Sequence, residues 1–443
     1  MILQREAYIE ALQAAKLDKT GYDRAIEMIN SSDIKAHGRN IPFSYIPLFI
    51  DDDDLIFFNN VIKTIQSILS KMTRHYIKDP KYREVFGFDK KMEELICLPC
   101  NYDEIIPVGR YDIFYDESDR SYKFCEFNTD GSGGMSRDYE MSCAILKSFA
   151  NREVVDRFNM RPFDLIGFMA ESIINVYRSD KNAIDNPTFC ITDFREEGVM
   201  SDFDRFIEEF RKRGINARFT DIRDLKFEGN HLVDSTDGTI INGIYRRAVT
   251  SVVLDRIEEC GDLIEAVRRQ KVVLIGHFRT SLAHSKVVSS AMFNPMTAEI
   301  LTESENDFIR EHMPRTYIMS KGLIPQEVLN DVLDNKNDWI IKPEEGFGSH
   351  GVYAGRDTDR DEWIRLIEDN MDSNYTVQEF IERSRVPLLG PNDDDIKFYP
   401  LMMGIYQACG EAAGFYSRAG EAGVIDFDHG GICVSTVRCG SIK

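Results

Sequence analysis

The chain has 443 residues, more than one ordinary hydrophobic core covers, which predicts two or three packed units. Hydrophobic residues make up 43% and charged residues 29%, which excludes a disordered chain, and no apolar run reaches the roughly 20 residues of a membrane-spanning helix. Acidic residues outnumber basic ones by 75 to 54. The resulting net charge of −21 argues against nucleic acid as a partner, because most of the surface would repel a phosphate backbone.

Nine cysteines, an odd number, follow a start that has no apolar signal-like core. This pattern predicts reduced thiols and a cytoplasmic location. Cys97 and Cys100 form a C-x-x-C motif, a spacing found in redox and zinc sites. No second such pair and no nearby histidine pair completes a metal site, so an ordinary structural role is favoured and the function of this pair stays open.

The first 90 residues are predicted to be mainly helical. From Phe58 onwards, apolar residues recur with the i, i+3, i+4, i+7 spacing of an amphipathic helix. The acidic run Asp51–Asp54 precedes this helix and suits its positive end, so we interpret the run as a cap rather than a catalytic cluster.

Residues 105–115 and 121–128 are strand-like, and the polar turn between them predicts an antiparallel hairpin. Alternate residues of a strand share a face, so Arg110 and Asp112 should point together. Glu126 and Asn128 should likewise share a face, while Cys125 and Phe127 are expected to face the other way.

If the two polar faces coincide, the hairpin brings together two carboxylates, one amide oxygen and one guanidinium group. Such oxygen donors suit Mg²⁺, which also bridges to substrate phosphates. An arginine there can neutralise charge on a transferring phosphoryl group. The alternative is a surface hairpin with cross-strand salt bridges.

A glycine-rich loop and a helix follow this hairpin, and residues 160–276 are predicted to form a separate α/β unit. A helix from about Phe163 is followed by the buried strand 188–193, a second helix and a strand that begins near residue 216. This order predicts a parallel sheet. Segments 239–247 and 271–276 are expected to be two further strands on either side of a helix.

The last third contains strand 338–343, a glycine loop, a second strand and extended segments at 375–381, 397–407 and 414–420. The loop matches G-x-G-x-x-G, a weak signal by itself. A dinucleotide site needs a helix after the loop, and a protein kinase needs its lysine after it, whereas here Lys342 comes first and a strand follows.

A lysine before a glycine flap suits a cover for nucleotide phosphates, with backbone N–H groups of Gly346, Gly348 and Gly351 close to the ligand. The alternative is an ordinary glycine-rich hairpin. The absence of a P-loop motif, together with the oxygen-rich hairpin, indicates a different ATP-binding architecture.

Three segments, KPEEGFGSHGV (342–352), VQEFI (377–381) and RYDIFYDESDRSYKFCEFNTDG (110–131), resemble the circularly permuted ATP-grasp family, in particular the synthetase domain of glutathionylspermidine synthase. The resemblance implies a glutathione synthetase-like ATP-grasp fold, α/β and α+β in several domains, with an inserted Rossmann-like pre-ATP-grasp unit. The implied regions are 1–90, helical; 91–159, a permuted segment with the metal hairpin; 160–276, the α/β insert; and 277–443, the nucleotide-binding region.

The resemblance also implies roles for individual residues. Arg110 and Arg418 would act in catalysis; Asp112, Glu126 and Asn128 would bind Mg²⁺. Lys286, Lys342 and the loop glycines would contact ATP phosphates, the hinge Gln378, Glu379, Phe380 and Ile381 would flank adenine, and Arg246 and Arg247 would hold the acid substrate.

The expected function is an ATP- and Mg²⁺-dependent carboxylate–amine ligase that forms an amide through an acyl phosphate. The alternatives are an ATP-grasp phosphotransferase and a non-catalytic nucleotide-binding subunit. The chain lacks room for the amidase domain of the bifunctional enzyme, and its loop carries Ser349 and His350 where a more basic or glycine-rich loop is usual. Glutathione and spermidine are therefore not specified as substrates, and the oligomeric state is not specified either.

Overall fold

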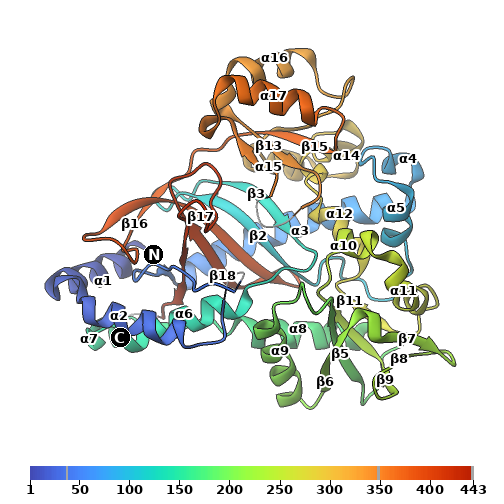
Figure 1. The fold of residues 1–443 in the computed structure, drawn as a ribbon, viewed down its shortest axis with the longest axis horizontal. Helices are drawn as coiled ribbons and strands as arrows, with labels where there is room; N and C mark the ends of the chain where they lie inside the picture. Colours follow the sequence, from blue (N-terminus) through green and yellow to red (C-terminus); the bar gives the residue numbers. More distant parts are fainter. Residues whose placement is uncertain (36–37, 347–349, 441–443) are drawn as a thin grey trace.

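The centre of the protein is a six-stranded antiparallel sheet in which distant parts of the chain pair (Figure 1). The computed structural model describes residues 1–35, 38–346 and 350–440. The predicted hairpin is confirmed as β2 (Val108–Tyr115) and β3 (Tyr122–Asn128). Strand β2 also pairs with β17 (Lys397–Ala408), which in turn pairs with β16 (Arg385–Leu388) and with β18 (Glu411–Ala419), and β19 (Ile432–Val434) completes the sheet.

One face of this sheet packs against the long helix α3 (Asp52–Lys78). Phe58 of the helix contacts Phe415 of β18, with ring centroids 5.3 Å apart. Asp51 caps α3 in a reciprocal capping box with Asp54, as the acidic run predicted. Because side chains of a strand alternate between faces, the polar residues of β2 and β3 lie on the opposite face of the sheet.

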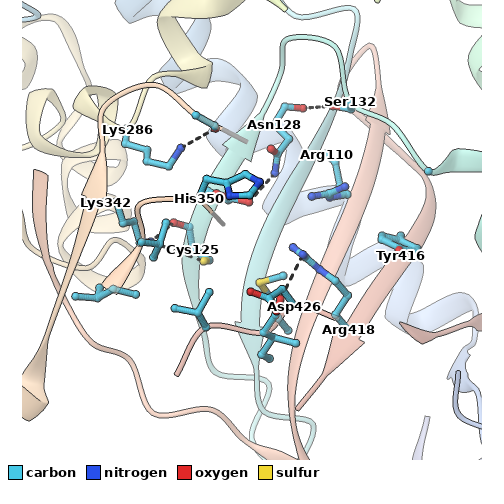
Figure 2. A pocket seen from close by; sticks show the side chains of 18 of the residues that line it. Arg110, Cys125, Asn128, Ser132, Lys286, Lys342, His350, Tyr416, Arg418 and Asp426 are labelled. Carbon is cyan, nitrogen blue, oxygen red and sulfur yellow. Dashed lines mark hydrogen bonds between the residues drawn. The ribbon is translucent and has the colours of Figure 1, made fainter. Parts of the chain in front are cut away.

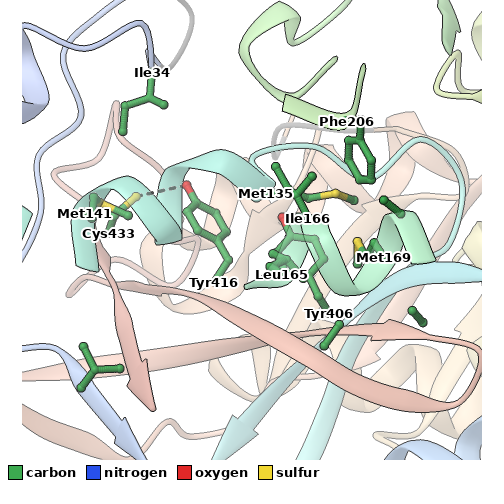
Figure 3. Packing of buried hydrophobic residues seen from close by; sticks show 14 of the residues in the cluster. Ile34, Met135, Met141, Leu165, Ile166, Met169, Phe206, Tyr406, Tyr416 and Cys433 are labelled. Atoms are coloured by element: carbon green, nitrogen blue, oxygen red, sulfur yellow. Dashed lines mark hydrogen bonds between the residues drawn. The ribbon is translucent and has the colours of Figure 1, made fainter. Parts of the chain in front are cut away.

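Helices α6 (Met135–Ser148) and α8 (Leu165–Ser179) cover one end of that opposite face. Figure 3 shows Met135, Leu165 and Ile166 packed around Tyr406 and Tyr416 of the sheet. The other end of this face forms the floor of a cavity.

The predicted parallel sheet of the α/β unit is confirmed, with strand order β11-β10-β5-β6. Helix α9 (Met200–Lys212) connects β5 (Thr188–Asp193) to β6 (Asn216–Asp221), and β10 (Gly243–Arg246) and β11 (Val273–Ile275) complete the sheet.

The prediction of one strand over 239–247 is wrong. Asn242 interrupts it, because its backbone and side chain bond to Thr188 and Val273 of neighbouring strands. The part before Asn242, β9 (Thr239–Ile241), belongs to a separate antiparallel sheet with β7 (Leu225–Glu228) and β8 (His231–Asp234).

A small antiparallel sheet with order β12-β15-β13-β14 stands at the top of Figure 1. Its strands are β12 (Thr316–Ile318), β13 (Trp339–Pro343), β14 (Tyr353–Ala354) and β15 (Tyr375–Glu379). Helices α16 (Gln326–Asp334) and α17 (Arg360–Asn370) cover it, and the buried side chain of Trp363 lies in their shared core. This unit carries the expected flap and hinge.

The first 90 residues are mainly helical, as predicted, with α1 (Ile2–Ala14), α2 (Lys19–Asn30), α3 and α4 (Pro80–Arg83). They also contribute β1 (Leu48–Ile50), which pairs in parallel with β20 (Thr436–Arg438); β4 (Arg161–Pro162) completes that sheet. The remaining α-helices are α5 (Lys90–Ile96), α7 (Arg152–Arg157), α10 (Thr250–Asp255), α11 (Gly261–Arg268), α12 (Ser281–His284), α13 (Val287–Ala291), α14 (Pro295–Ile300) and α15 (Glu303–His312). In the described part of the chain, every helix is too short or too polar to cross a membrane.

Candidate active site

A cavity of about 540 Å³ lies over the open end of the six-stranded sheet and reaches the small sheet. Figure 2 shows Lys286 and Lys342 on one side of it and Arg110 and Arg418 on the other. Residues predicted from the sequence that line the cavity are Arg110, Glu126, Asn128, Lys286, Lys342, Gly346, Gln378, Glu379, Phe380, Ile381 and Arg418. The fold therefore brings the hairpin and the glycine loop to one place, as the sequence analysis required.

The floor of the cavity is set by strand register. Glu126 lies opposite Asp112, and Asp112 lies opposite Gly404 of β17. A Cβ atom on Gly404 would stand 2.8 Å from Cδ of Arg110 and 2.9 Å from Oδ1 of Asp112. Glycine at this position therefore leaves the space that the Arg110 and Asp112 side chains occupy.

Arg110 and Asp112 form a two-point ion pair. Nε of Arg110 donates to Oδ1 of Asp112 at 2.6 Å, and Nη2 donates to Oδ2 at 2.9 Å. The guanidinium carbon lies 5.8 Å from the ring centres of both Tyr406 and Tyr416. The Asp112 side chain is fully buried, and burial raises its pKa despite the neighbouring Arg110. Asp112 consequently lies beneath the cavity surface, with its oxygens turned toward Arg110.

The predicted metal ligands Asp112, Glu126 and Asn128 lie close together. Nδ2 of Asn128 lies 3.3 Å from Oδ2 of Asp112 and 3.1 Å from Oε1 of Glu126, so two carboxylates flank one point. An amide turned over would present its oxygen near that point. No group of three or more His, Cys, Asp or Glu side chains suited to a metal occurs among the described residues. Two carboxylates and an amide fit Mg²⁺, which takes few protein ligands beside phosphate oxygens.

Cys125 departs from the prediction, because it lines the cavity beside Glu126. The register of β2 and β3 shifts between Asp112 and Ile113, so that Asp112 faces Glu126 and Ile113 faces Phe124. Cys125 is therefore the extra residue of a β-bulge, which turns it out of strict alternation. Phe127 is buried in the core on the α3 side, as expected.

Two lysines approach the hairpin. Lys342 lies on β13 of the small sheet, and Lys286 directly precedes α13. Nζ of Lys342 donates to Oε1 of Gln378 at 2.7 Å and lies 3.4 Å from the carbonyl of Cys125. Nζ of Lys286 donates to the carbonyl of Gly346 at 3.3 Å. Burial raises the pKa of Glu126, but Lys286 and Lys342 outweigh it, so this pKa lies well below its usual range.

The glycine loop is only partly described. Gly346 lines the cavity, and the prediction for Gly348 lies outside the described residues. Gly351 is not among the lining residues, and its φ of 72° with a would-be Cβ 2.7 Å from the Tyr375 hydroxyl explains glycine there. His350, directly before Gly351, lines the cavity.

The expected hinge lies at the end of β15. The side chain of Gln378 is buried between Lys342 and Thr316, and the Phe380 N–H donates to the carbonyl of Asp338 at 2.7 Å. The guanidinium of Arg356 lies 3.9 Å above the Phe380 ring. Two groups of the hinge, the Gln378 side chain and the Phe380 N–H, therefore already have protein partners.

Arg418 lies on β18 in the cavity wall. Its Nη1 donates to the carbonyl of Ile425 at 3.4 Å, and Nη2 lies 3.7 Å from Oδ2 of Asp112 (Figure 2). Arg110 and Arg418 thus share one carboxylate.

Arg246 and Arg247 do not line the cavity, in contrast to the substrate role that was expected. Both are buried. Arg246 binds Asp130 and the carbonyl of Gly276, and Arg247 binds the carbonyl of Ser132. These bonds hold the loop after β3 to the end of β10.

Several lining residues were not predicted, among them Arg39, Arg137, His284, Arg383 and Asp426. Arg383 follows the hinge by two residues, and its Nη2 donates to the carbonyl of Ala422 at 2.7 Å. Nδ1 of His284 donates to the carbonyl of Phe127 at 3.3 Å, and burial lowers the pKa of this histidine. A basic residue two positions after the hinge was a signal available in the sequence, whereas no sequence signal pointed to Arg39.

The described geometry can be compared with known proteins. No known protein family and no curated protein matches the sequence. Among solved structures, a glutathione synthetase-like effector from Globodera pallida, in its apo form, is similar with a TM-score of 0.62 over 95% of this chain and 96% of that chain, at 14% identity. D-cycloserine synthetase aligns with a TM-score of 0.31 at 11% identity over 57% of this chain and 91% of that chain. The first likeness shows that the mixed α/β fold is similar to that of a glutathione synthetase-like protein.

Proposed function

We propose that this protein is an ATP-grasp enzyme that joins a carboxylate to an amine through an acyl phosphate. The observation that carries the proposal is one cavity in which two lysines face two arginines across a hairpin bearing carboxylates. Phosphoryl transfer needs positioning and charge neutralisation above all, and these four cations surround the place where phosphates would lie. The likeness to a glutathione synthetase-like protein supports the same class of fold.

Each group has a task in this proposal. Lys286 and Lys342 hold the phosphates of ATP, and the hinge 378–381 lies beside the base. Asp112, Glu126 and Asn128 would hold Mg²⁺, which would neutralise phosphate charge. Arg110 and Arg418 orient the carboxylate toward the terminal phosphorus and stabilise the charge that develops there. The glycine loop limits access of water to the activated acid.

Both oxygens of Asp112 are bonded to Arg110, so Asp112 would hold Mg²⁺ only through an oxygen that Arg110 no longer bonds. Arg418 lies 3.7 Å from the same carboxylate and would remain a cationic neighbour of it. The partners proposed are a small-molecule or peptide carboxylate and an amine. All nine cysteines, which lie within the described residues, are free, and this supports the proposed cytoplasmic location.

The test is ADP release over mixtures of acids and amines, followed by mass spectrometry of the product. We expect an amide to form together with ADP, and Asp112→Asn to lower turnover by roughly 10²–10³-fold while the fold is retained. Asp116→Asn, on the hairpin turn outside the cavity, is the matched control. A phosphorylated acid without amide would indicate the phosphotransferase, and ATP binding without ADP release would indicate a non-catalytic binding protein. Unchanged turnover in Asp112→Asn would refute the assignment of this site.

A further inference from the structure

A second cavity, of about 370 Å³, adjoins the first and shares Arg39 and Phe427 with it. Its walls come from the N-terminal region and from two later loops. The lining residues are Ile26, Asn30, Arg39, Asn40, Ile41, Pro42, Phe43, Pro391 and Phe427. None of the roles assigned above uses this cavity.

The lining of the second cavity is apolar with two amides. Six of its residues carry hydrocarbon, proline or aromatic side chains, and Asn30 and Asn40 add hydrogen-bonding groups. No carboxylate occurs among these lining residues, although the whole chain has a net charge of −21. The one charged residue, Arg39, is paired with Asp428 at 2.8 Å. Such walls suit an uncharged apolar group near an amide, and they offer no counter-ion for an ammonium group.

The two cavities are joined along one segment, residues 423–428, which we call the crossing segment. All six of its residues line the first cavity. Arg418 bonds to the carbonyl of Ile425, Phe427 faces both cavities, and Asp428 pairs with Arg39. The crossing segment thus leads from the arginines of the first cavity directly to the second.

The volume of the first cavity limits how much of the two substrates it can hold. A drug-sized ligand occupies a pocket of roughly 300–1,000 Å³, so a nucleotide takes most of the 540 Å³ of the first cavity. An acid whose carboxylate reaches Arg110 and Arg418 must then extend its remaining atoms along the crossing segment.

We propose that the second cavity binds the apolar, uncharged tail of the acid substrate, and that an amide in that substrate meets Asn30 or Asn40. The proposal rests on the function proposed above for the identity of the acid as substrate. It predicts selection for acids with an apolar end and rejection of the same acids with a terminal ammonium group.

The test uses three acids as probes, N-acetylglycine, N-hexanoylglycine and N-(6-aminohexanoyl)glycine, and measures their binding to the full chain by calorimetry. N-hexanoylglycine should bind at least tenfold more tightly than N-acetylglycine, and the terminal ammonium should remove this gain. Ile26→Trp, which fills the second cavity from α2, should also remove it. Ile240→Trp, at an exposed site on β9, is the matched control and should retain it.

Equal binding of the acetyl and hexanoyl acids, a full gain for the ammonium acid, retention of the gain in Ile26→Trp, or no binding of any probe would each overturn the proposal. Thermal unfolding of each variant establishes that it is folded, and Ile26→Ala, which enlarges the cavity, gives a second variant in which the tail should still bind. A parallel titration with ADP separates the two proposals. ADP binding without a tail effect removes only the second cavity's role, and a tail effect without ADP binding removes only the enzyme.

Discussion

Two glycine-rich loops flank the candidate site, and they differ in the partners that their backbone groups bond to. The first, Thr129–Ser136, follows β3 and leads into α6. The second, Glu344–Gly351, follows β13. In sequence both are rich in glycine and small polar residues, which suits close approach to a phosphate.

The first loop is held by carboxylates and arginines of the α/β unit. Asp202 accepts hydrogen bonds from the N–H groups of Gly134, Met135 and Ser136 at 2.8, 3.2 and 2.8 Å. These are the groups at the N-terminus of α6 that could otherwise bind an anion. Asp130 anchors the start of the loop to Arg246. An anion site is therefore already occupied here by the protein's own Asp202, which makes this loop a fixed wall.

The described part of the second loop bonds to Asn374, Ser285 and Lys286. The N–H of Lys286 donates to the carbonyl of Glu344 at 3.0 Å, and its Nζ donates to the carbonyl of Gly346. Because that ammonium group also lines the cavity, a phosphate can compete for it. Glycine content alone therefore does not identify a phosphate-binding loop. The partners of its backbone groups determine whether it is free to bind an anion.

The largest loss of stability is expected from removing Asp202, the carboxylate that fixes the first loop. Asp202→Ala leaves three backbone N–H groups and the buried Arg247 without their carboxylate, and it should lower the free energy of unfolding by about 3–5 kcal/mol. Urea denaturation measures this. Asp204→Ala, exposed on the same helix, is the control and should change stability by less than about 0.5 kcal/mol. A small loss in Asp202→Ala would show that the first loop is not fixed in the way described.

A smaller effect on stability, but a clear one on ligand binding, is expected at the second loop. Lys286→Met should weaken ADP binding by roughly a hundredfold, about 2.7 kcal/mol, because the ammonium group that would contact the phosphates is removed. Its unfolding free energy should change by no more than about 1 kcal/mol. Calorimetric titration with ADP is the measurement, and Lys321→Met, at an exposed site outside the cavity lining, is the control. Unchanged ADP affinity would remove Lys286 from the site.

Much of this arrangement followed from local patterns in the sequence. Alternation in 105–128 predicted the hairpin and the shared face of Arg110 and Asp112, since strand geometry alone fixes these features. The order of Lys342 and the glycine-rich segment was visible in the sequence itself. The convergence of both segments came from the family resemblance, because no local rule relates residues so far apart.

Two of the failures have a common physical cause, which is pairing between strands. The bulge at Cys125 and the break at Asn242 exist because of neighbouring strands, and these were not visible in either segment alone. The expected role of Arg246 and Arg247 in holding the acid substrate came from the family resemblance alone. Their guanidinium groups instead bind Asp130 and Ser132, partners that lie more than 100 residues away in the chain.

The smallest effect concerns the pH dependence of the second loop. Burial raises the pKa of Glu345 from its ordinary 4.5 to about 7 and does the same to Glu344. The folded protein therefore holds a proton on Glu345 that the unfolded chain releases, so this group's favourable contribution is present below pH 4.5 and is lost as the pH rises through 7. Glu345→Gln should leave stability at pH 5 nearly unchanged and raise it at pH 8, by about 1 kcal/mol after allowance for solvent. Denaturation of both proteins between pH 5 and 8 measures the difference, with Glu327→Gln, exposed on α16, as the control. A difference that does not grow with pH would mean that Glu345 is ionised throughout, and the second loop would then carry a fixed negative charge beside Lys286.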